Sequence, residues 1–393
     1  MNHPYPPPLM TSESFARYTV VHRLPSIVTD VIAENDYPPA IVSTLEILRD
    51  ELGEHSIAPL TQDAPDAAAW NRAREPYCDH SWLEIPWYFA ESYFYRRLLE
   101  AICYFRPGDF QGRDPFEHRK KGALKGEAAR KLLKMVLAGE AADEKERFAR
   151  LLHASLWGNR ADLSNIILAA GPEEGLDCAS GDDLLLDHSP AAWPLIAPGR
   201  LRRVDFLCDN AGLEALLDLV LIDFLLDSGL CQQIVFHLKD RPFFVSDTMI
   251  QDIAPMLAAL RQIGGPAADL ASRLEAHRRG GRWILKSDPF WTSWLCFAEM
   301  PAHLYDELAQ SDLIILKGDL NYRRLLGDRW WPPTMPLEEA ANYFPLPFMT
   351  LRTLKSEIIV GLREGEAEKL TATDPDWLVN GRRGLIHLVR RET

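Results

Sequence analysis

The second half of the chain alternates short apolar runs with stretches of helical spacing, and this alternation limits the possible folds more than any other feature. The apolar runs are rich in β-branched or aromatic residues, which favour strands. Strands that alternate with helices are typical of a mostly parallel sheet covered by helices, and continuous apolar strands fit a sheet buried on both faces. We predict strands at 204–208, 234–238, 283–285, 313–316, 358–360 and 385–389, and helices at 211–226, 249–263 and 301–309.

The first part of the chain has a different character. Residues 1–40 are rich in proline and polar side chains, which predicts an extended arm. Residues 41–168 show helical spacing and many strong helix formers, without a convincing strand pattern. Residues 169–393 form the α/β part, which opens with a loop-like segment over 171–199 that holds a short helix near 191–196. The sequence therefore predicts an α/β fold with a helical N-terminal region docked on it.

The charge balance limits the partners of the protein. The 393 residues include 43 lysines and arginines against 57 aspartates and glutamates, which gives a formal net charge of −14. A nucleic-acid-binding surface needs a basic footprint, so we expect no nucleic-acid partner. An anionic substrate is compatible with this acidity only if a metal ion or a few well-placed cations reverse the field locally.

The sequence predicts neither a secretion signal nor a membrane span. The first eight residues include four prolines and no apolar segment, unlike a secretory signal peptide. The most apolar stretch, 211–226, is interrupted by Glu214, Asp218 and Asp223, which argues against a membrane span. The six cysteines are scattered without a metal-binding spacing, which is typical of reduced thiols. We therefore expect a cytoplasmic or nuclear protein with no membrane partner.

Polar side chains follow the predicted strands, at the edge where open α/β sheets bind ligands. Asp209 and Asn210 come directly after one strand and just before a helix, and Asp247 lies beyond the next strand. Carboxylate and amide oxygens are suitable ligands for Mg²⁺ or Mn²⁺. The alternative is that Asp209 or Asn210 only caps the following helix, a position that both residue types favour.

The helix predicted at 211–226 carries acidic residues that need partners, because an unpaired buried charge is costly. Glu214 and Asp218 are four residues apart and share one helix face. Glu214 lies in the first turn, where it either supports the metal ligands or simply complements the helix dipole.

A segment that follows the predicted strand at 313–316 brings cations together with polar side chains. It combines Lys317 and Arg323 with Asp319 and Asn321. Lysine and arginine bind phosphate oxygens, so this segment is a candidate phosphate site. A loop held together by salt bridges would have the same composition.

Two shorter motifs offer further polar groups. Residues 352–355 place two cations and a hydroxyl group close together, and Asn159 lies one helical turn from Asp162. Several standard signatures are missing, namely glycine-rich nucleotide loops, the GxSxG nucleophile motif and the HExxH zinc motif. The 11 histidines are scattered singly, so we do not expect them to be metal ligands.

Together these motifs resemble those of the damage-control phosphatases, in particular the subfamily with an RTxK signature that is also called the acidic-residue or protein-glutamate O-methyltransferase family. The matching segments occur in the family's order and extend over about 86–355. They are PWYFAESYFYRRLLEA (86–101), SLWGNRADLS (155–164), VDFLCDNAGLEALLDLVLIDFLL (204–226), FFVSDT (243–248), SDPFWTS (287–293), KGDLNYRRLLGD (317–328) and RTLK (352–355).

The resemblance implies a three-layer α/β/α sandwich with a mostly parallel sheet and an N-terminal helical region packed on it. It implies a metal and catalytic centre formed by Asp209, Asn210 and Asp247. The residues implied in phosphosubstrate binding are Asp319, Leu320, Asn321, Tyr322, Arg323 and Lys355, with Asn159 and Asp162 closing the site and Glu214, Arg352 and Thr353 supporting it.

The family's activity gives the functional hypothesis. The resemblance implies that the protein is a phosphatase that uses Mn²⁺, Ni²⁺, Co²⁺ or Mg²⁺ and acts on small phosphometabolites. It also implies sugar phosphates such as fructose 1-phosphate or fructose 6-phosphate as the substrates. Attack by water and attack by an aspartate carboxylate are both chemically open. The alternatives are an S-adenosylmethionine-dependent carboxyl methyltransferase, for which the sequence offers no glycine-rich cofactor loop, and a non-catalytic metal-binding interaction protein.

Overall fold

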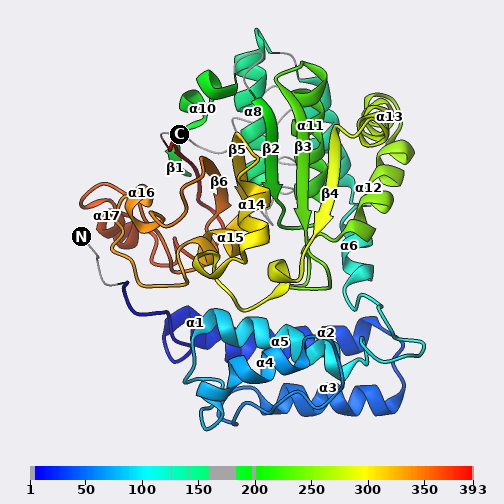
Figure 1. Ribbon diagram of the computed structural model, residues 1–393, viewed down its shortest axis with the longest axis vertical. Helices are drawn as coiled ribbons and strands as arrows, with labels where there is room; N and C mark the ends of the chain where they lie inside the picture. The colour runs from blue at the N-terminus through cyan, green and yellow to red at the C-terminus, as the bar shows by residue number, and fades with distance from the viewer. Residues whose placement is uncertain (1–4, 125, 140, 159–182, 197–200, 392–393) are drawn as a thin grey trace.

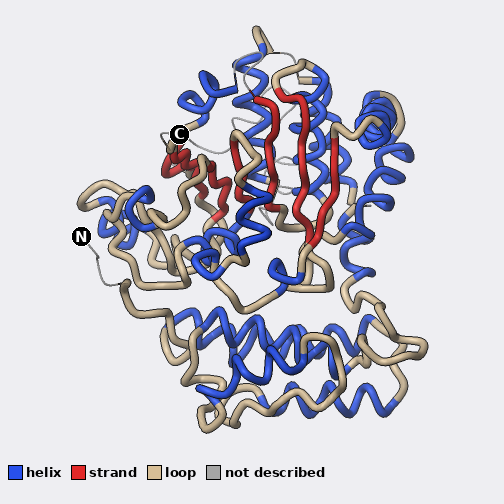
Figure 2. Tube along the Cα trace, viewed as in Figure 1, coloured by secondary structure: helices blue, strands red, loops and turns tan. Residues whose placement is uncertain are grey.

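The computed structural model describes residues 5–124, 126–139, 141–158, 183–196 and 201–391, which form an α/β sandwich with a further layer of helices at one end (Figures 1 and 2). The sheet in this part of the chain has seven strands in the order β1-β7-β6-β5-β2-β3-β4. Neighbouring strands are parallel except β6 and β7, which are antiparallel. The strands are β1 (Leu184–Asp187), β2 (Leu201–Leu207), β3 (Cys231–Leu238), β4 (Trp283–Ser287), β5 (Leu313–Lys317), β6 (Phe348–Thr353) and β7 (Gly384–Val389).

Helices cover both faces of the sheet. Successive residues of a strand point to opposite faces, so a strand that is buried throughout contributes to the core on each face. Phe206 and Ile315 belong to the core under the first set of helices, and Ile314 and Leu316 belong to the core under the second set. The predicted three-layer α/β/α arrangement is therefore confirmed. The first set is α7 (Glu127–Ala138), α8 (Glu144–Trp157), α10 (Ser189–Ile196), α11 (Leu213–Asp227), α12 (Ile250–Ile263) and α13 (Pro266–Arg279), and the second is α14 (Ala302–Leu308), α15 (Gly318–Leu325), α16 (Leu337–Ala340) and α17 (Glu366–Thr373).

The N-terminal segment is helical, so the prediction of an extended arm over 1–40 is wrong from Ser14 onward. Val20, Leu24 and Val28 are fully buried at helical spacing, and Pro25 lies in the first turn of its helix, where proline is tolerated. The prolines had concealed this pattern. The elements are α1 (Ser14–Tyr18), the π-helix Thr19–Arg23, α2 (Leu24–Glu34), α3 (Pro39–Glu51), α4 (Ala67–Arg74), α5 (Trp87–Ala101) and α6 (Glu117–Ala123).

The helical part predicted at 41–168 divides between two places in the fold. Helices α1 to α5 form the layer at the end of the sandwich, whereas α8 lies against the sheet (Figure 1). Leu132 of α7 and Leu152 of α8 belong to the core that α11 shares with the sheet. These two helices are amphipathic and bury their apolar faces there, which their sequence alone could not assign to a partner.

The prediction of a strand at 358–360 is wrong. The strand in this part of the chain is β6, which lies between β5 and β7 and whose polar residues Thr350, Arg352 and Thr353 concealed it. The carbonyl of Ile358 instead accepts a hydrogen bond from the Arg352 guanidinium, and the amide of Val360 donates to the Tyr322 hydroxyl. Residues 358–360 are therefore an apolar buried loop rather than part of a ladder. β1 and the helices α13, α15, α16 and α17 were also not predicted.

The carboxyl ends of the central strands lie next to the N-terminal helices. β2, β3 and β4 run with their carboxyl ends toward α1 to α5 (Figure 1). Phe243, beyond β3, and Leu320, on α15, belong to the same core as the N-terminal helices. Within the described residues, none of the helices combines the length and the apolar character that crossing a bilayer demands.

Candidate active site

The residues after β2 and β3 meet at the carboxyl edge of the sheet. Asn210 and Asp247 form an antiparallel bridge. The Thr248 amide donates to the Asp209 carbonyl at 2.8 Å, and the Ala211 amide donates to the Ser246 carbonyl at 2.7 Å. These backbone bonds bring together the three residues that the sequence placed at the metal centre.

Side-chain contacts join the members of this centre. The Asn210 amide donates to Asp209 Oδ2 at 2.6 Å and to Glu214 Oε2 at 2.9 Å, while its oxygen accepts from the Ser246 hydroxyl. The N-cap of α11 is Gly212, without a side-chain cap. The capping alternative for Asp209 and Asn210 is therefore not what the structure shows.

Burial raises the pKa values of two carboxyl groups of this centre, those of Asp209 and Asp247. Burial, with Glu214 and Asp247 adding to it, raises the pKa of Asp209 well above its ordinary value. Burial also raises the pKa of Asp247 to about 6, although Lys239, whose Nζ lies 3.3 Å from Asp247 Oδ2, opposes the shift. The two buried carboxyl groups favour a compensating cation, because burying charge without compensation is costly.

The donor set fits a hard divalent ion. Asp247 Oδ2 is buried, with the Lys239 ammonium group 3.3 Å away as its ionic partner. Gly318 leaves room beside Asp209, since a Cβ on Gly318 would lie 1.9 Å from Asp209 Oδ2. The described residues hold no group of three His, Cys, Asp or Glu side chains able to ligate a metal. The candidate centre therefore has two carboxylates and one amide, a set that leaves further positions for water and substrate oxygens.

A buried ionic network lies directly behind Asn210. Lys317 is fully buried, and its Nζ lies 3.3 Å from Glu214 Oε1 and 2.9 Å from Asp218 Oδ1. It also donates to Ser155 Oγ, which in turn donates to Asp218. Of the two alternatives for this segment, Lys317 therefore fits the one in which salt bridges hold the segment together, because its charge is paired inside the protein. The expectation that Glu214 supports the metal ligands agrees with its contact to Asn210.

A cavity of about 160 Å³ opens beside the centre. The N-terminal layer contributes Arg23 and Trp87 to its wall. The remaining wall residues are Asp209, Asn210, Phe244, Ser246 and Asp247 from the strand ends, and Asp319, Leu320, Arg323 and Lys355 from α15 and the segment after β6.

Arg323 and Arg352 are held rigidly by carboxylates. Arg323 donates to Glu91 at 2.6 Å and to Asp328 at 2.8 Å, and its guanidinium lies 3.8 Å from the centre of the Trp87 ring. Arg352 donates to Asp319 Oδ1 at 2.7 Å, and the same oxygen accepts from the Lys355 amide at 3.2 Å. The Arg352–Asp319 pair thus fixes the backbone that presents Lys355 to the cavity.

Other predicted site residues lie away from the cavity wall. Asn321 donates to the carbonyls of Leu207 and Lys317, so it ties α15 to the strand ends. Tyr322 is fully buried beneath Arg352, and the Thr353 hydroxyl donates to a carbonyl of α8. Asn159 and Asp162 lie outside the described residues.

Comparison with known proteins decides the family. Residues 19–370 match the model of the damage-control phosphatase ARMT1-like domain. The chain belongs to the ARMT1-like damage-control phosphatase family. The proteins named damage-control phosphatase ARMT1 from Danio rerio, Mus musculus and Homo sapiens are 36%, 35% and 32% identical to it, over 95% of this chain and 94%, 95% and 96% of theirs.

A solved structure shares the fold. A DUF89 family protein from Pyrococcus horikoshii superposes with a TM-score of 0.51 at 13% identity, and the match covers 95% of this chain and 98% of the other. The family model and the ARMT1 relatives confirm the resemblance seen in the motifs and the expectation of a phosphatase.

Sequence reasoning missed several residues that this damage-control phosphatase places at its cavity. Arg23 and Trp87 come from the N-terminal layer, and Phe244 and Ser246 come from a loop after β3. Phe244 and Val245 have φ of 44° and 65°, values that are strained for such side chains and that cluster at functional sites. The strain was not visible in the sequence, but the motif FFVSDT was a signal for this loop.

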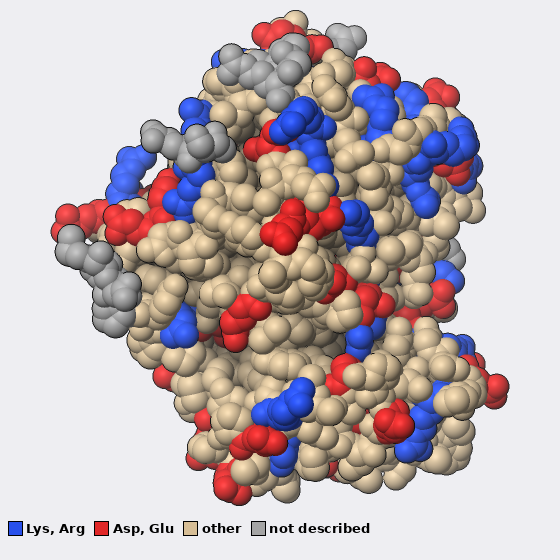
Figure 3. Space-filling view, viewed as in Figure 1, with Lys and Arg blue, Asp and Glu red and all other residues tan. Residues whose placement is uncertain are grey.

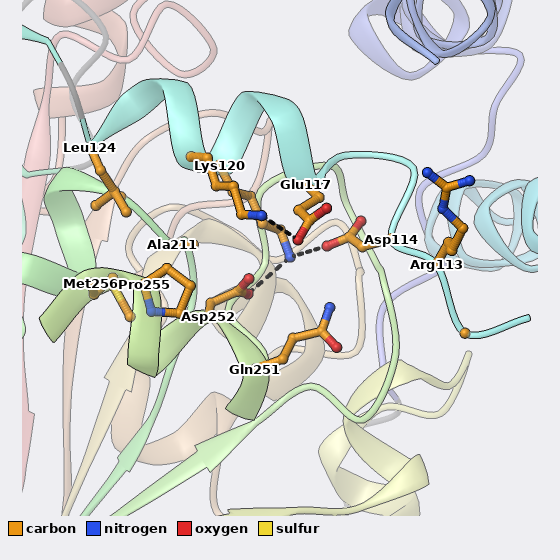
Figure 4. A pocket seen from close by; sticks show the side chains of 13 residues that line it. Arg113, Asp114, Glu117, Lys120, Leu124, Ala211, Gln251, Asp252, Pro255 and Met256 are labelled. Atoms are coloured by element: carbon orange, nitrogen blue, oxygen red, sulfur yellow. Dashed lines mark hydrogen bonds and ion pairs between the residues drawn. The ribbon is translucent and has the colours of Figure 1, made fainter. Parts of the chain in front are cut away.

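A second cavity of about 290 Å³ lies between α6 and α12, and Ala211 and Gly212 also line it (Figure 4). Lys120 reaches into it from α6 and forms ion pairs with Asp114 and Asp252 at 2.9 and 3.1 Å.

On the molecular face seen in Figure 3, basic and acidic side chains are mixed.

Proposed function

We propose that the protein is a divalent-metal-dependent phosphatase that hydrolyses small phosphometabolites, with sugar phosphates such as fructose 1-phosphate or fructose 6-phosphate as its substrates. The observation that carries the proposal is one small cavity with buried carboxylates at Asp209 and Asp247 and with basic side chains, including Lys355, in the same wall. We place this activity in the cytoplasm or the nucleus.

In this proposal Asp209, Asn210 and Asp247 hold the cation. A divalent ion bound there supplies electrostatic stabilisation to the phosphoryl oxygens as charge redistributes. Ser246 fixes the side-chain oxygen of Asn210, and Glu214 fixes its amide group, so the ligand is oriented before metal binds. Such preorganisation avoids reorganisation at the moment of reaction.

The opposite part of the wall receives the remaining substrate charge. Lys355 contacts phosphoryl oxygens as a point charge, and its placement follows from the hydrogen bond between its amide and Asp319. Arg323 contributes to the potential of the cavity from a fixed position, because Glu91 and Asp328 hold it. Phe244 and Leu320 offer an apolar surface to the organic part of the substrate.

Replacing Lys355 with methionine tests the phosphate-binding role. We expect KM for a sugar phosphate to rise about 10–100-fold, since a charge-assisted hydrogen bond contributes about 1.5–3 kcal/mol. The affinity for Mn²⁺ should stay within about twofold, because Lys355 is not a proposed ligand. Lys369→Met, an exposed lysine on α17, is the matched control. A collapse of metal binding in the Lys355 variant would show that the division of roles is wrong.

The raised carboxyl pKa values predict how metal stabilisation depends on pH. The folded-state pKa of Asp247 is about 6, above the unfolded value of about 3.9. Without metal, the stability from this carboxyl is full below about pH 4 and is lost as pH rises through about 6. Metal binding needs the deprotonated carboxylate. Saturating Mn²⁺ should therefore raise the melting temperature by about 5 °C or more near pH 7.5 and by much less near pH 5.

Differential scanning fluorimetry with and without Mn²⁺ at the two pH values checks this prediction. Asp306→Ala, which removes an exposed carboxylate on α14, should reproduce the wild-type pattern. A metal-induced shift of equal size at both pH values would mean that the buried carboxyls do not bind the ion.

A further inference from the structure

Arg23 reaches the cavity from an unusual backbone segment. It is the last residue of a π-helix, Thr19–Arg23, that joins α1 to α2. π-Helical turns are rare and often occur at functional sites. The Arg23 side chain is 43% exposed and lines the same cavity as Asp209 and Asp247.

The partner of Arg23 is shared with a second arginine. Arg23 Nη1 lies 3.1 Å from Glu91 Oε1, and Glu91 is fully buried. The other oxygen of Glu91 accepts from Arg323 Nη1 at 2.6 Å. Arg323 is itself buried and is also paired with Asp328. Glu91 therefore keeps a close, buried cationic partner even when Arg23 turns away.

The two arginines differ in the cost of moving. Withdrawal of Arg323 would leave Glu91 and Asp328 as buried carboxylates without that cation, which is strongly unfavourable. Withdrawal of Arg23 returns a 43% exposed guanidinium to water and leaves Glu91 paired with Arg323, so it costs less. Of the two, Arg23 is the one that can change partner at low cost.

We infer that Arg23 exchanges Glu91 for the phosphoryl oxygens of the bound substrate, so that the N-terminal helical layer supplies a substrate-binding residue. Arginine fits this role because its planar guanidinium can donate two parallel hydrogen bonds to a phosphate. The inference rests on the proposed function, since it assumes a phosphomonoester in this cavity. Arg323 then serves as a positioning residue that holds Glu91 while Arg23 is away.

The test compares Arg23→Met and Arg23→Lys with Arg17→Met. Arg17 is a matched control because it also lies in the N-terminal layer, is 51% exposed and pairs with one glutamate, Glu54. The measurements are the affinity of the Mn²⁺-loaded protein for inorganic phosphate by calorimetry, its Mn²⁺ affinity, and KM and kcat for fructose 1-phosphate.

We expect Arg23→Met to weaken phosphate binding about 10–100-fold and to raise KM by a similar factor. Arg23→Lys should recover part of this loss, because it restores charge but not the paired donors. Mn²⁺ affinity should not change in either variant, and Arg17→Met should behave as wild type. A purely structural role would lower thermal stability without this selective effect on phosphate.

The outcomes separate the two ideas. Wild-type turnover with unchanged phosphate affinity and KM in Arg23→Met would overturn the role of Arg23 and leave the phosphatase proposal intact. Arg23-dependent phosphate binding without turnover of any sugar phosphate would support the role of Arg23 and contradict the proposed function. Absence of phosphate binding in the wild type would contradict both.

Discussion

Replacement of Asp209 by alanine is expected to abolish divalent-metal binding and phosphate release while the protein stays folded. Asp209 is a buried carboxylate that faces Asn210, and the loop that carries Asp247 hydrogen-bonds to its backbone. A divalent ion held at this centre would contribute several kcal/mol to transition-state charge stabilisation, so its loss should lower kcat/KM by at least about 10³-fold.

The same substitution should not destabilise the metal-free protein. Burial raises the pKa of Asp209, so its charged form disfavours folding near neutral pH. Removal of the carboxylate should leave the metal-free melting temperature unchanged or higher. Calorimetric metal titration, phosphate release and thermal melting measure the three effects, with Asp306→Ala as the surface control. Metal-dependent turnover at the wild-type rate in Asp209→Ala would contradict the assignment of the centre.

Replacement of Lys317 by methionine should destabilise the fold by about 3–5 kcal/mol, because it removes one partner of a buried ionic group. Lys317 faces two carboxylates, Glu214 and Asp218, inside the protein. Burial alone would lower the pKa of Lys317, but Asp218 and Glu214 outweigh burial and raise it, so the lysine is charged. Without Lys317, these two buried carboxylates would lose the cation that both of them contact.

Urea unfolding of the metal-free protein measures this loss, and two variants control for it. Lys121→Met breaks an exposed pair with Glu117 and should cost less than about 0.5 kcal/mol. Adding Asp218→Asn to Lys317→Met should recover part of the stability, since it removes one unpaired charge, and the two effects should not be additive. Equal losses in Lys317→Met and Lys121→Met would show that the buried network does not stabilise the fold.

The sequence was most informative about the site where polar side chains come directly after predicted strands. The strand ends singled out Asp209 and Asn210, and the family resemblance added Asp247 to them; the backbone bridge between Asn210 and Asp247 shows these two residues adjacent. Helix α11 was also predictable, because apart from its four acidic residues it is apolar on all sides, and it is almost entirely buried.

The cations were harder to assign from sequence. Lysine and arginine are typical of phosphate sites, yet Lys317 and Arg352 are fully buried and form ion pairs with carboxylates. Whether a lysine after a strand faces a cavity or the interior depends on residues far away in the chain, here Glu214 and Asp218. Arg23 was missed for the same reason, since its place in the cavity depends on how the N-terminal layer packs on the sheet.

The most direct test of the account is phosphate release by the wild-type protein from a panel of sugar phosphates, after removal of metal and after addition of Mn²⁺, Ni²⁺, Co²⁺ or Mg²⁺. A parallel titration with S-adenosylmethionine tests the methyltransferase alternative. We expect no release from the metal-free protein, and release from fructose 1-phosphate or fructose 6-phosphate with at least one of these ions. Release at the same rate without metal, or no release with any ion, would rule out a metal-dependent sugar-phosphate phosphatase.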